Sequence, residues 1–304
     1  MLDYSDMSAC KITPDPISQK QSSVCKLRIV EIMPCETLGG STTLSLDDLQ
    51  PTLDSHKGNK IFAETLKKIN DIDSLFRVLC QFVQFNAVFG AGVATLASEL
   101  AHGTEIFRDP DDPMHLAADR SCEVAATVYF AAVDEFNRHK THRFMAQETL
   151  RAAAKFIGHS HEAINDLGRI TRATTIATQK VARGYCYGKN LKAPDLFKGI
   201  GFHSGSEILA AMEFEILHNY LTSDQADFVK FLESSNAYTW IAIHPVVEQD
   251  HFEAALETAN RAIAYFPEKS QAKKWILDGF AHFAAVQGEF MNSLLALVSS
   301  PVQH

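Results

Sequence analysis

Most of the chain repeats its hydrophobic residues every three to four positions, which is the spacing of one face of an α-helix. The pattern is established in "NKIFAETLKKINDIDSLFRVLCQFVQFNAVFGAGVATLASELAHG" and continues almost to the C-terminal end. Clusters of Pro, Gly, Asp and Ser interrupt it and predict loops at "RDPDDPMH", "GYCYGKNLKAPDLFKGIGFHSGS" and "YFPEKS". Long helices joined in this way predict an all-α bundle of six to eight helices.

The first 56 residues follow a different pattern. They are rich in Ser, Thr, Pro, Lys and Asp and contain one short β-like run, "KLRIVEIM". We therefore predict a poorly ordered or peripheral extension over residues 1–56 and a single helical domain over residues 57–304. The segment 170–205 is unusually rich in Gly, so we expect it to form a lid or crossover beside a functional site.

Composition narrows the class of protein. A chain of 304 residues with 46% hydrophobic content can bury one large core or two small ones. The formal net charge of −9 argues against a nucleic-acid partner. No apolar run was expected to reach the roughly 18 residues that span a bilayer, and six cysteines without C-x2-C pairs predict reduced thiols. We accordingly expect a cytoplasmic protein with no membrane partner.

Candidate chemistry first appears in "IAIHPVVEQDHFEAALETANRAI", where His244, Glu248 and His251 recur at i, i+4 and i+7. These positions share one stripe of a helix whose other residues are largely apolar. Ionisable groups are costly to bury, so their presence there points to a functional reason. Pro245 predicts that the helix either begins there, capped by His244, or kinks there.

A second candidate helix, "VYFAAVDEFNRHKTHRFMAQETLRAA", carries Glu135 and His142 at the same i, i+7 spacing, with His139 between them. We interpret Glu135 and His142 as candidate ligands on one helix, and His139 as a supporting or surface residue.

A third candidate helix, "SEILAAMEFEILHNYL", brings the acids Glu207, Glu213 and Glu215 together with His218. Carboxylates on separate amphipathic helices, two of them accompanied by histidine, are what a dinuclear metal centre in a helical bundle requires. Three carboxylates nearly balance two divalent ions, and mixed imidazole and oxygen ligands suit iron.

These motifs resemble those of the haem-oxygenase-like dimetal oxidases. The resemblance covers about residues 60–295 and includes the order of the helices and the 31 residues between Glu213 and His244. One position departs from the family pattern, since Asp is more usual at Glu248. The resemblance implies a haem-oxygenase-like bundle with a set of metal ligands on the matching positions: Glu135, His142, Glu213, His244, Glu248 and His251. It also favours Glu213 over Glu215 as the ligand of the third helix.

The resemblance implies a haem-free oxidoreductase that binds two iron ions as Fe²⁺ and uses O2 as co-substrate. Relatives act on amino acids or fatty acids, by desaturation, ring formation, N-oxygenation or carbon–carbon cleavage. By analogy we expect a small amino acid or derivative in specialised metabolism, such as natural product biosynthesis. The sequence leaves the oligomeric state open between a monomer and a homodimer.

Other residues support weaker or competing interpretations. His159 and His161 lie among turn-forming residues and are expected at a helix end. Arginines at 169, 172 and 183 could bind a carboxylate, although surface charge is the default interpretation. A metal-free, thiaminase-like hydrolase would need a cysteine nucleophile, for which Cys122 and Cys186 are the candidates. A non-catalytic helical interaction protein would leave the buried His and Glu unexplained.

Overall fold

The computed structural model describes residues 43–108, 117–137, 140–188 and 191–299. All regular secondary structure in these residues is helical, which confirms the all-α prediction. The helices are more numerous than the six to eight expected: α1 (Leu46–Ser55), α2 (Gly58–Lys67), α3 (Ile72–Asn86), α4 (Phe89–His102), α5 (Ala117–Glu135), α6 (His142–Ile157), α7 (His161–Leu167), α8 (Arg172–Gly184), α9 (Ala193–Asp224), α10 (Ala226–Ser234), α11 (Thr239–Ala264) and α12 (Lys269–Ser299). The run "KLRIVEIM", His139 and most of "RDPDDPMH" lie outside the described residues.

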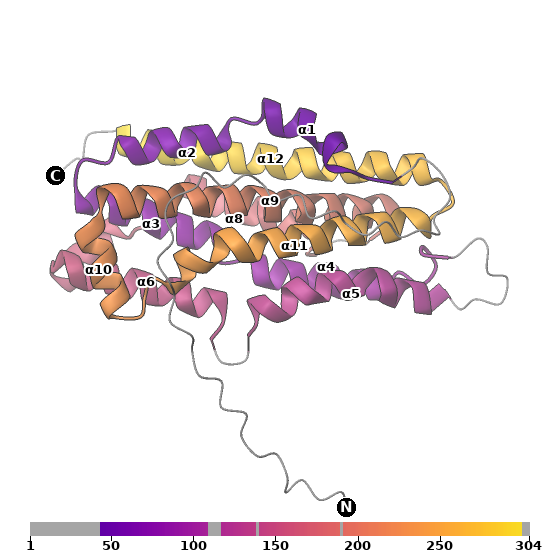
Figure 1. The fold of residues 1–304 in the computed structure, drawn as a ribbon, viewed down its shortest axis with the longest axis horizontal. Helices are drawn as coiled ribbons and strands as arrows, with labels where there is room; N and C mark the ends of the chain where they lie inside the picture. Colours follow the sequence, from indigo (N-terminus) through magenta and orange to yellow (C-terminus); the bar gives the residue numbers. More distant parts are fainter. Residues whose placement is uncertain (1–42, 109–116, 138–139, 189–190, 300–304) are drawn as a thin grey trace, which may run out of the picture. The chain divides into compact units, whose positions relative to one another are not determined.

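The long helix α9 is the centre of the helical packing. It packs most extensively against α12 on one side and α11 on the other. Beyond α12 lie α1 and α2, and beyond α11 lie α5 and its partner α4 (Figure 1). Functional side chains on α5, α9 and α11 can therefore meet in the layer between these three helices.

The helical body begins earlier than the sequence indicated. Helix α1 starts at Leu46, where Ser45 and Asp48 cap each other: the backbone N–H of Ser45 donates to the Asp48 carboxylate at 2.8 Å. Leu44 and Leu49 are buried, and the backbone of Leu44 is bonded by the side chain of Asn260 on α11. Residues 43–56 thus belong to the helical body, although their Ser, Thr, Pro and Asp content placed them in the extension.

The glycine-rich segment before residue 206 is mostly helix. Residues 172–184 form α8, and α9 begins at Ala193, so the predicted lid or crossover consists largely of core helices. Gly201 on α9 lies against the carbonyl of Ile276 on α12, and Gly279 on α12 lies against the carbonyl of Lys198 on α9. These two glycines allow backbone-to-backbone contact between the helices. In the sequence, glycines with this role look the same as glycines that mark a loop.

The segment that carries Glu135 and His142 is two helices. Helix α5 ends at Glu135 and α6 begins at His142. The break is stabilised by Thr141, whose hydroxyl accepts a hydrogen bond of 3.1 Å from the backbone N–H of Phe144. The predicted single helical stripe is therefore wrong, and the two side chains must meet through the turn.

Pro245 lies inside a continuous helix. Helix α11 runs from Thr239 to Ala264, so His244 is in the second turn and is not its cap. The ring of Pro245 removes one backbone donor, which leaves the carbonyl four residues earlier without its helical partner. "YFPEKS" forms the turn between α11 and α12, as predicted.

One part of the chain meets the length and composition of a membrane span. The segment Ile72–His102, which comprises α3 and α4, is apolar enough by these criteria alone, so the expectation of no such run was wrong. Half of its most apolar window is buried inside the structure, as in core helices of proteins that cross no membrane.

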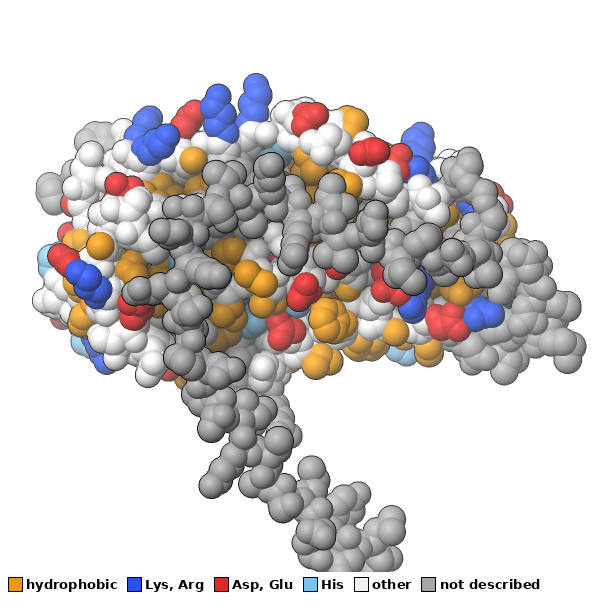
Figure 2. All heavy atoms as spheres, in the orientation of Figure 1, with side chains coloured by type: hydrophobic (Ala, Val, Ile, Leu, Met, Phe, Trp, Pro, Cys, Tyr) orange, Lys and Arg blue, Asp and Glu red, His pale blue; other side chains and the backbone are white. Residues whose placement is uncertain are grey.

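An apolar strip is exposed on α5. Phe130 and Val133 on α5, and Phe136 directly after its last residue, recur three residues apart and are all exposed, together with Tyr129. On the face shown in Figure 2, hydrophobic side chains reach the surface along the edge that α5 forms in this orientation. This strip borders the candidate site described below.

The contact of α9 with α12 predicts the effect of adding one methyl group. Gly279→Ala should lower the free energy of unfolding by about 1–3 kcal/mol, because the backbones must move apart to admit the new side chain. Gly288→Ala is the matched control on the same helix, since its methyl group would approach nothing closer than 3.8 Å. It should leave stability unchanged or raise it by up to about 1 kcal/mol, through helix propensity. Urea denaturation of both variants measures the difference, and equal stabilities would contradict the close contact.

Candidate metal centre

The stripe on α11 is buried as predicted. His244, Glu248 and His251 are each less than 5% exposed. His251 Nδ1 lies 3.2 Å from Glu248 Oε2, and His244 Nε2 lies 3.6 Å from Glu248 Oε1. The helical period thus brings the three groups to one face, where Glu248 stands between the two imidazoles.

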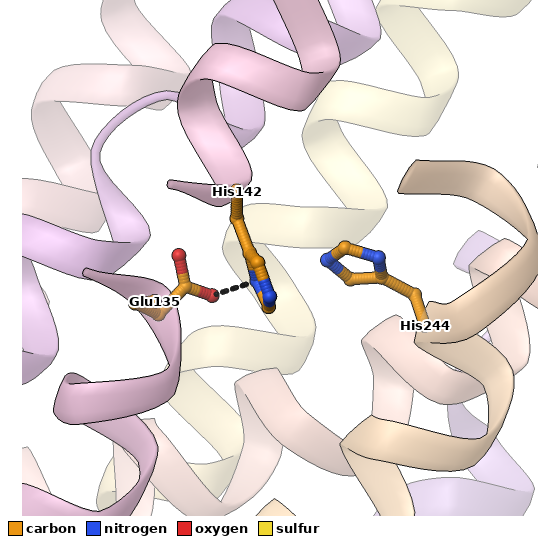
Figure 3. A group of neighbouring side chains, drawn as sticks. All are labelled: Glu135, His142 and His244. Carbon is orange, nitrogen blue, oxygen red and sulfur yellow. Dashed lines mark hydrogen bonds and ion pairs between the residues drawn. The ribbon is translucent and has the colours of Figure 1, made fainter. Parts of the chain in front are cut away.

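A first triad gathers Glu135, His142 and His244. One ligand atom from each lies within 4.8 Å of the other two, and Glu135 Oε1 is 3.1 Å from His142 Nδ1. Figure 3 shows the three side chains converging from the end of α5, the start of α6 and α11. The helix break before His142, which Thr141 caps, therefore brings Glu135 and His142 together, although one continuous helix was predicted to do so.

A second triad gathers Glu207, Glu248 and His251, with ligand atoms again within 4.8 Å of one another. All three side chains are buried, and Glu207 Oε2 is 3.4 Å from His251 Nδ1. Glu207 is on α9, so this triad joins the central helix to α11.

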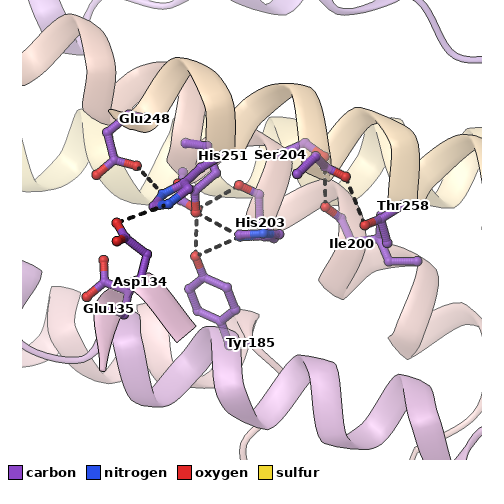
Figure 4. Close-up of polar contacts among 12 residues, drawn as sticks. Asp134, Glu135, Tyr185, Ile200, His203, Ser204, Glu248, His251 and Thr258 are labelled. Atoms are coloured by element: carbon purple, nitrogen blue, oxygen red, sulfur yellow. Dashed lines mark hydrogen bonds and ion pairs between the residues drawn. The ribbon is translucent and has the colours of Figure 1, made fainter. Parts of the chain in front are cut away.

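The two triads are adjacent. Glu248 belongs to the second triad and also faces His244 of the first. Asp134 provides another link, because its Oδ2 is 3.4 Å from Nε2 of both His142 and His251. Figure 4 shows Asp134 beside His251. A carboxylate that faces both imidazoles could help to hold metal ions there. Asp134 was not among the residues predicted from the sequence, which favoured the neighbouring Glu135.

Glu213 is not part of either triad. It is six residues from Glu207, which places it about 9 Å further along α9 and about 120° around the axis. Its buried carboxylate instead accepts a hydrogen bond from the side-chain amide of Gln287 on α12. Glu215 is exposed, so the acid that α9 brings to the triads is Glu207 and not the predicted Glu213.

A network on α8 and α9 supports Glu207. His203 Nδ1 is 2.9 Å from Glu207 Oε1. The fully buried Tyr185 places its hydroxyl 2.5 Å from Ser206 Oγ and 3.5 Å from His203 Nδ1. Partners of this kind fix the orientation of a ligand carboxylate. The signal was available in "FHSGSE", which repeats the His-x3-Glu spacing of "HPVVE".

In the second triad, burial and neighbouring charges raise the pKa values of Glu248 and His251 and lower that of Glu207. Burial and the adjacent Glu207 raise the pKa of Glu248 well above its usual value. Burial also raises the pKa of Glu207, but the charge of His203 and hydrogen bonds from His203 and His251 outweigh it and hold that pKa well below its usual value. Burial lowers the pKa of His251, but hydrogen bonds to both carboxylates outweigh it and raise that pKa to about 11. Without metal, a protonated His251 therefore compensates the buried negative charge.

In the first triad, the imidazole of His244 is neutral. Burial and the nearby His142 lower the pKa of His244 to about 3. Its Nδ1 is bonded to the backbone carbonyl of Trp240, which can only accept, so the hydrogen is on Nδ1 and the lone pair is on Nε2. The pKa of His142 is lowered by burial, but Glu135 outweighs this and raises it overall.

A cavity of about 150 Å³ touches both triads. Its wall includes five of the six triad residues, all except His251, and apolar side chains of α3, α4, α6 and α9. Phe136 from the exposed strip on α5 also lines it, and Phe130 of the same strip packs edge-on against His251 at 5.8 Å. The candidate ligands are thus reached through an opening with an apolar border.

The remaining candidates from the sequence lie elsewhere. His159 and His161 are at the junction of α6 and α7, as predicted. The three arginines considered for carboxylate binding are all exposed, and none lines the cavity: Arg169, Arg172 and Arg183. Cys122 and Cys186 are likewise not part of the cavity wall.

The donor set fits two divalent ions. Each triad offers carboxylate oxygen and imidazole nitrogen, which suit iron and related first-row metals. The two triads contain three carboxylates, and Asp134 is a fourth. Together their negative charges would match the four positive charges of two such ions. No protein-family model matches the chain, and no curated protein sequence matches it. The assignment therefore depends on the geometry and on the resemblance of the motifs.

The buried Glu213 predicts a pH dependence of stability. Burial raises the pKa of Glu213 to about 8, only partly opposed by the Gln287 hydrogen bond. A raised folded-state pKa favours folding at low pH, and this contribution is lost as pH rises from about 4.5 towards 8. Glutamine does not ionise, so Glu213→Gln removes this loss of stability. At pH 7 the free energy of unfolding of the variant should therefore be higher than that of the wild type by on the order of 3 kcal/mol.

The prediction is tested by measuring the free energy of unfolding of Glu213→Gln and of the wild type as a function of pH. The two proteins should converge in stability below about pH 4.5, where Glu213 is protonated in both the folded and unfolded states. Glu215→Gln, exposed on the same helix, serves as the control and should parallel the wild type. Parallel profiles for Glu213→Gln and the wild type would contradict a protonated, buried Glu213.

Proposed function

We propose that the protein is a non-haem dimetal oxidase or oxygenase of the haem-oxygenase-like type, with two iron ions as cofactor and O2 as co-substrate. The observation that carries the proposal is the adjacency of two buried triads of carboxylate and imidazole, linked by Glu248 and Asp134. The all-helical packing around α9 and α11 is consistent with the bundle that the resemblance implies.

The side chains have separate tasks in this proposal. Glu135, His142 and His244 would hold one ion, and Glu207, Glu248 and His251 the other. Two ferrous ions held by these residues would supply electrons for the reduction of dioxygen. His203 and the carbonyl of Trp240 orient Glu207 and His244, respectively, before any ion arrives.

Burial of the site has a chemical consequence. The apolar wall excludes water from the reacting groups, which strengthens electrostatic interactions inside and suppresses side reactions. Binding of an ion must expel the proton that His251 carries in the metal-free protein, because a ligating imidazole donates its lone pair. His251 therefore couples the filling of the site to proton release.

We further propose a small amino acid or derivative as the substrate and a cytoplasmic location, with no membrane or nucleic-acid partner. The cavity of about 150 Å³ supports a small substrate over a long-chain fatty acid. The metal-free hydrolase has no comparable support, since neither candidate cysteine lines the cavity.

The proposal is tested by metal content and oxygen consumption. Protein reconstituted anaerobically with ferrous iron should hold two ions per chain, and exposure to oxygen should change its absorbance. Small amino acids should accelerate oxygen consumption more than fatty acids do, with products identified by mass spectrometry. Absence of bound iron after reconstitution would overturn the proposal, and acceleration by fatty acids alone would overturn the substrate class.

Two acids on α9 test whether the structure or the family resemblance identifies the ligand of this helix. The structure favours Glu207, and the resemblance favours Glu213. Glu207→Gln should lose at least one of the two ions, because it removes a carboxylate ligand that no neighbour replaces. Glu213→Gln should retain both, since Glu213 contacts Gln287 and lies outside the triads. Metal analysis of the two variants decides between them. Loss of iron in Glu213→Gln with full occupancy in Glu207→Gln would reverse the assignment.

A further inference from the structure

Most polar side chains in the cavity wall already have partners. The amide of Asn86 donates to the carbonyl of Phe82, and the hydroxyl of Thr141 caps α6. The hydroxyl of Ser206 is bonded to Tyr185 and to the carbonyl of His203. The acids and histidines of the wall are the candidate metal ligands. These bonds engage the Asn86 amide, the Thr141 hydroxyl and the Ser206 hydroxyl.

Two other polar side chains in the wall, Arg143 and Trp240, make no side-chain hydrogen bond or ion pair with the described residues. Arg143 lines the cavity and is exposed, and its guanidinium forms no ion pair with any residue in the described part of the chain. Trp240 lines the cavity and is almost fully buried, and its indole N–H has no acceptor within the described ranges. The exposure of Arg143 places it at the opening of the cavity, and Trp240 lies deeper.

Both of these side chains are donors only. A guanidinium and an indole N–H offer hydrogens and cannot accept them. The ligand that satisfies them must therefore present acceptor oxygens, and an arginine prefers a carboxylate, which it binds through two parallel hydrogen bonds. Position also favours Arg143, because it directly follows His142, so a group held at the opening is one residue from the first triad.

The cavity limits the size of this ligand. A volume of about 150 Å³ is comparable with cavities that hold one benzene molecule. The opening is bordered by Phe136, and alanines at 87, 91, 146 and 210 contribute to the wall, so the body of the ligand meets mainly apolar surface.

We propose that Arg143 anchors the carboxylate of a small substrate at the opening of the cavity, and so determines specificity for short carboxylic acids, amino acids among them. This inference rests on the proposed function for the identity of the reaction. The anchor itself depends only on the cavity and on residues that are not candidate metal ligands.

Binding of simple probes to the iron-loaded, oxygen-free protein tests the anchor. Calorimetry with butyrate should detect binding, and butyramide, which lacks the charge, should bind at least about tenfold more weakly. Arg143→Gln should weaken butyrate binding by a similar factor, and Arg143→Lys by less, because it keeps the charge but loses the paired hydrogen bonds. Arg151→Gln, an exposed arginine further along α6 and outside the cavity, is the matched control and should bind butyrate like the wild type.

Iron content separates this inference from the proposed function. Arg143→Gln should hold as much iron as the wild type, so that a loss of butyrate binding reports on the anchor alone. If the protein binds no iron, butyrate binding that requires Arg143 still supports the anchor while the proposed function fails. Butyrate binding that is equal in Arg143→Gln and wild type overturns the anchor, and dodecanoate binding as tight as that of butyrate overturns the size limit.

Discussion

The structure is constrained most by the electrostatic cost of placing carboxylates and imidazoles between packed helices. An uncompensated charge in such surroundings costs far more than a single packing contact provides. The protein meets this cost by interleaving acids with bases, so that His251 faces Glu207, Glu248 and Asp134, and His142 faces Glu135. The arrangement of α5, α6, α9 and α11 follows from the need to bring these opposite charges together.

The rest of the fold positions the helices that carry these groups. The backbone contact through Gly201 and Gly279 fixes α9 against α12, and the Thr141 cap fixes the start of α6 next to the end of α5. Stacked aromatic rings such as Phe85 on Phe290 and Phe214 on His244 fill the space between the helices. Close packing of this kind leaves the ligand side chains little freedom to separate when the site holds no metal.

The sequence predicted those features that depend on helical period alone. The stripe of His244, Glu248 and His251 is one helix face, and its burial follows from the apolar residues around it. Glu135 and His142 were predicted to meet for the wrong reason, because a turn brings them together and not a helical repeat. The sequence favoured Glu213 over Glu215, and the structure buries Glu213 as expected but brings Glu207 to the triad. Both Glu207 and Glu213 are buried on α9, and only the packing partners of the helix decide which one faces α11. Arg143 carried no sequence signal, since its role depends on a cavity formed by distant segments.

The fixed number of residues on α9 between Gly201 and Glu207 restricts where insertions and deletions can occur in related sequences. The glycine sets the rotation of the helix against α12, and the carboxylate six residues later inherits that rotation. Insertion or deletion of one residue between them would turn Glu207 by about 100° away from His251. A change in length at residues 191–192, which precede α9 and are not helical, leaves this rotation unchanged, whereas one between 201 and 207 does not. Homologous chains that keep the two triads should keep this interval constant, even where the residues within it differ.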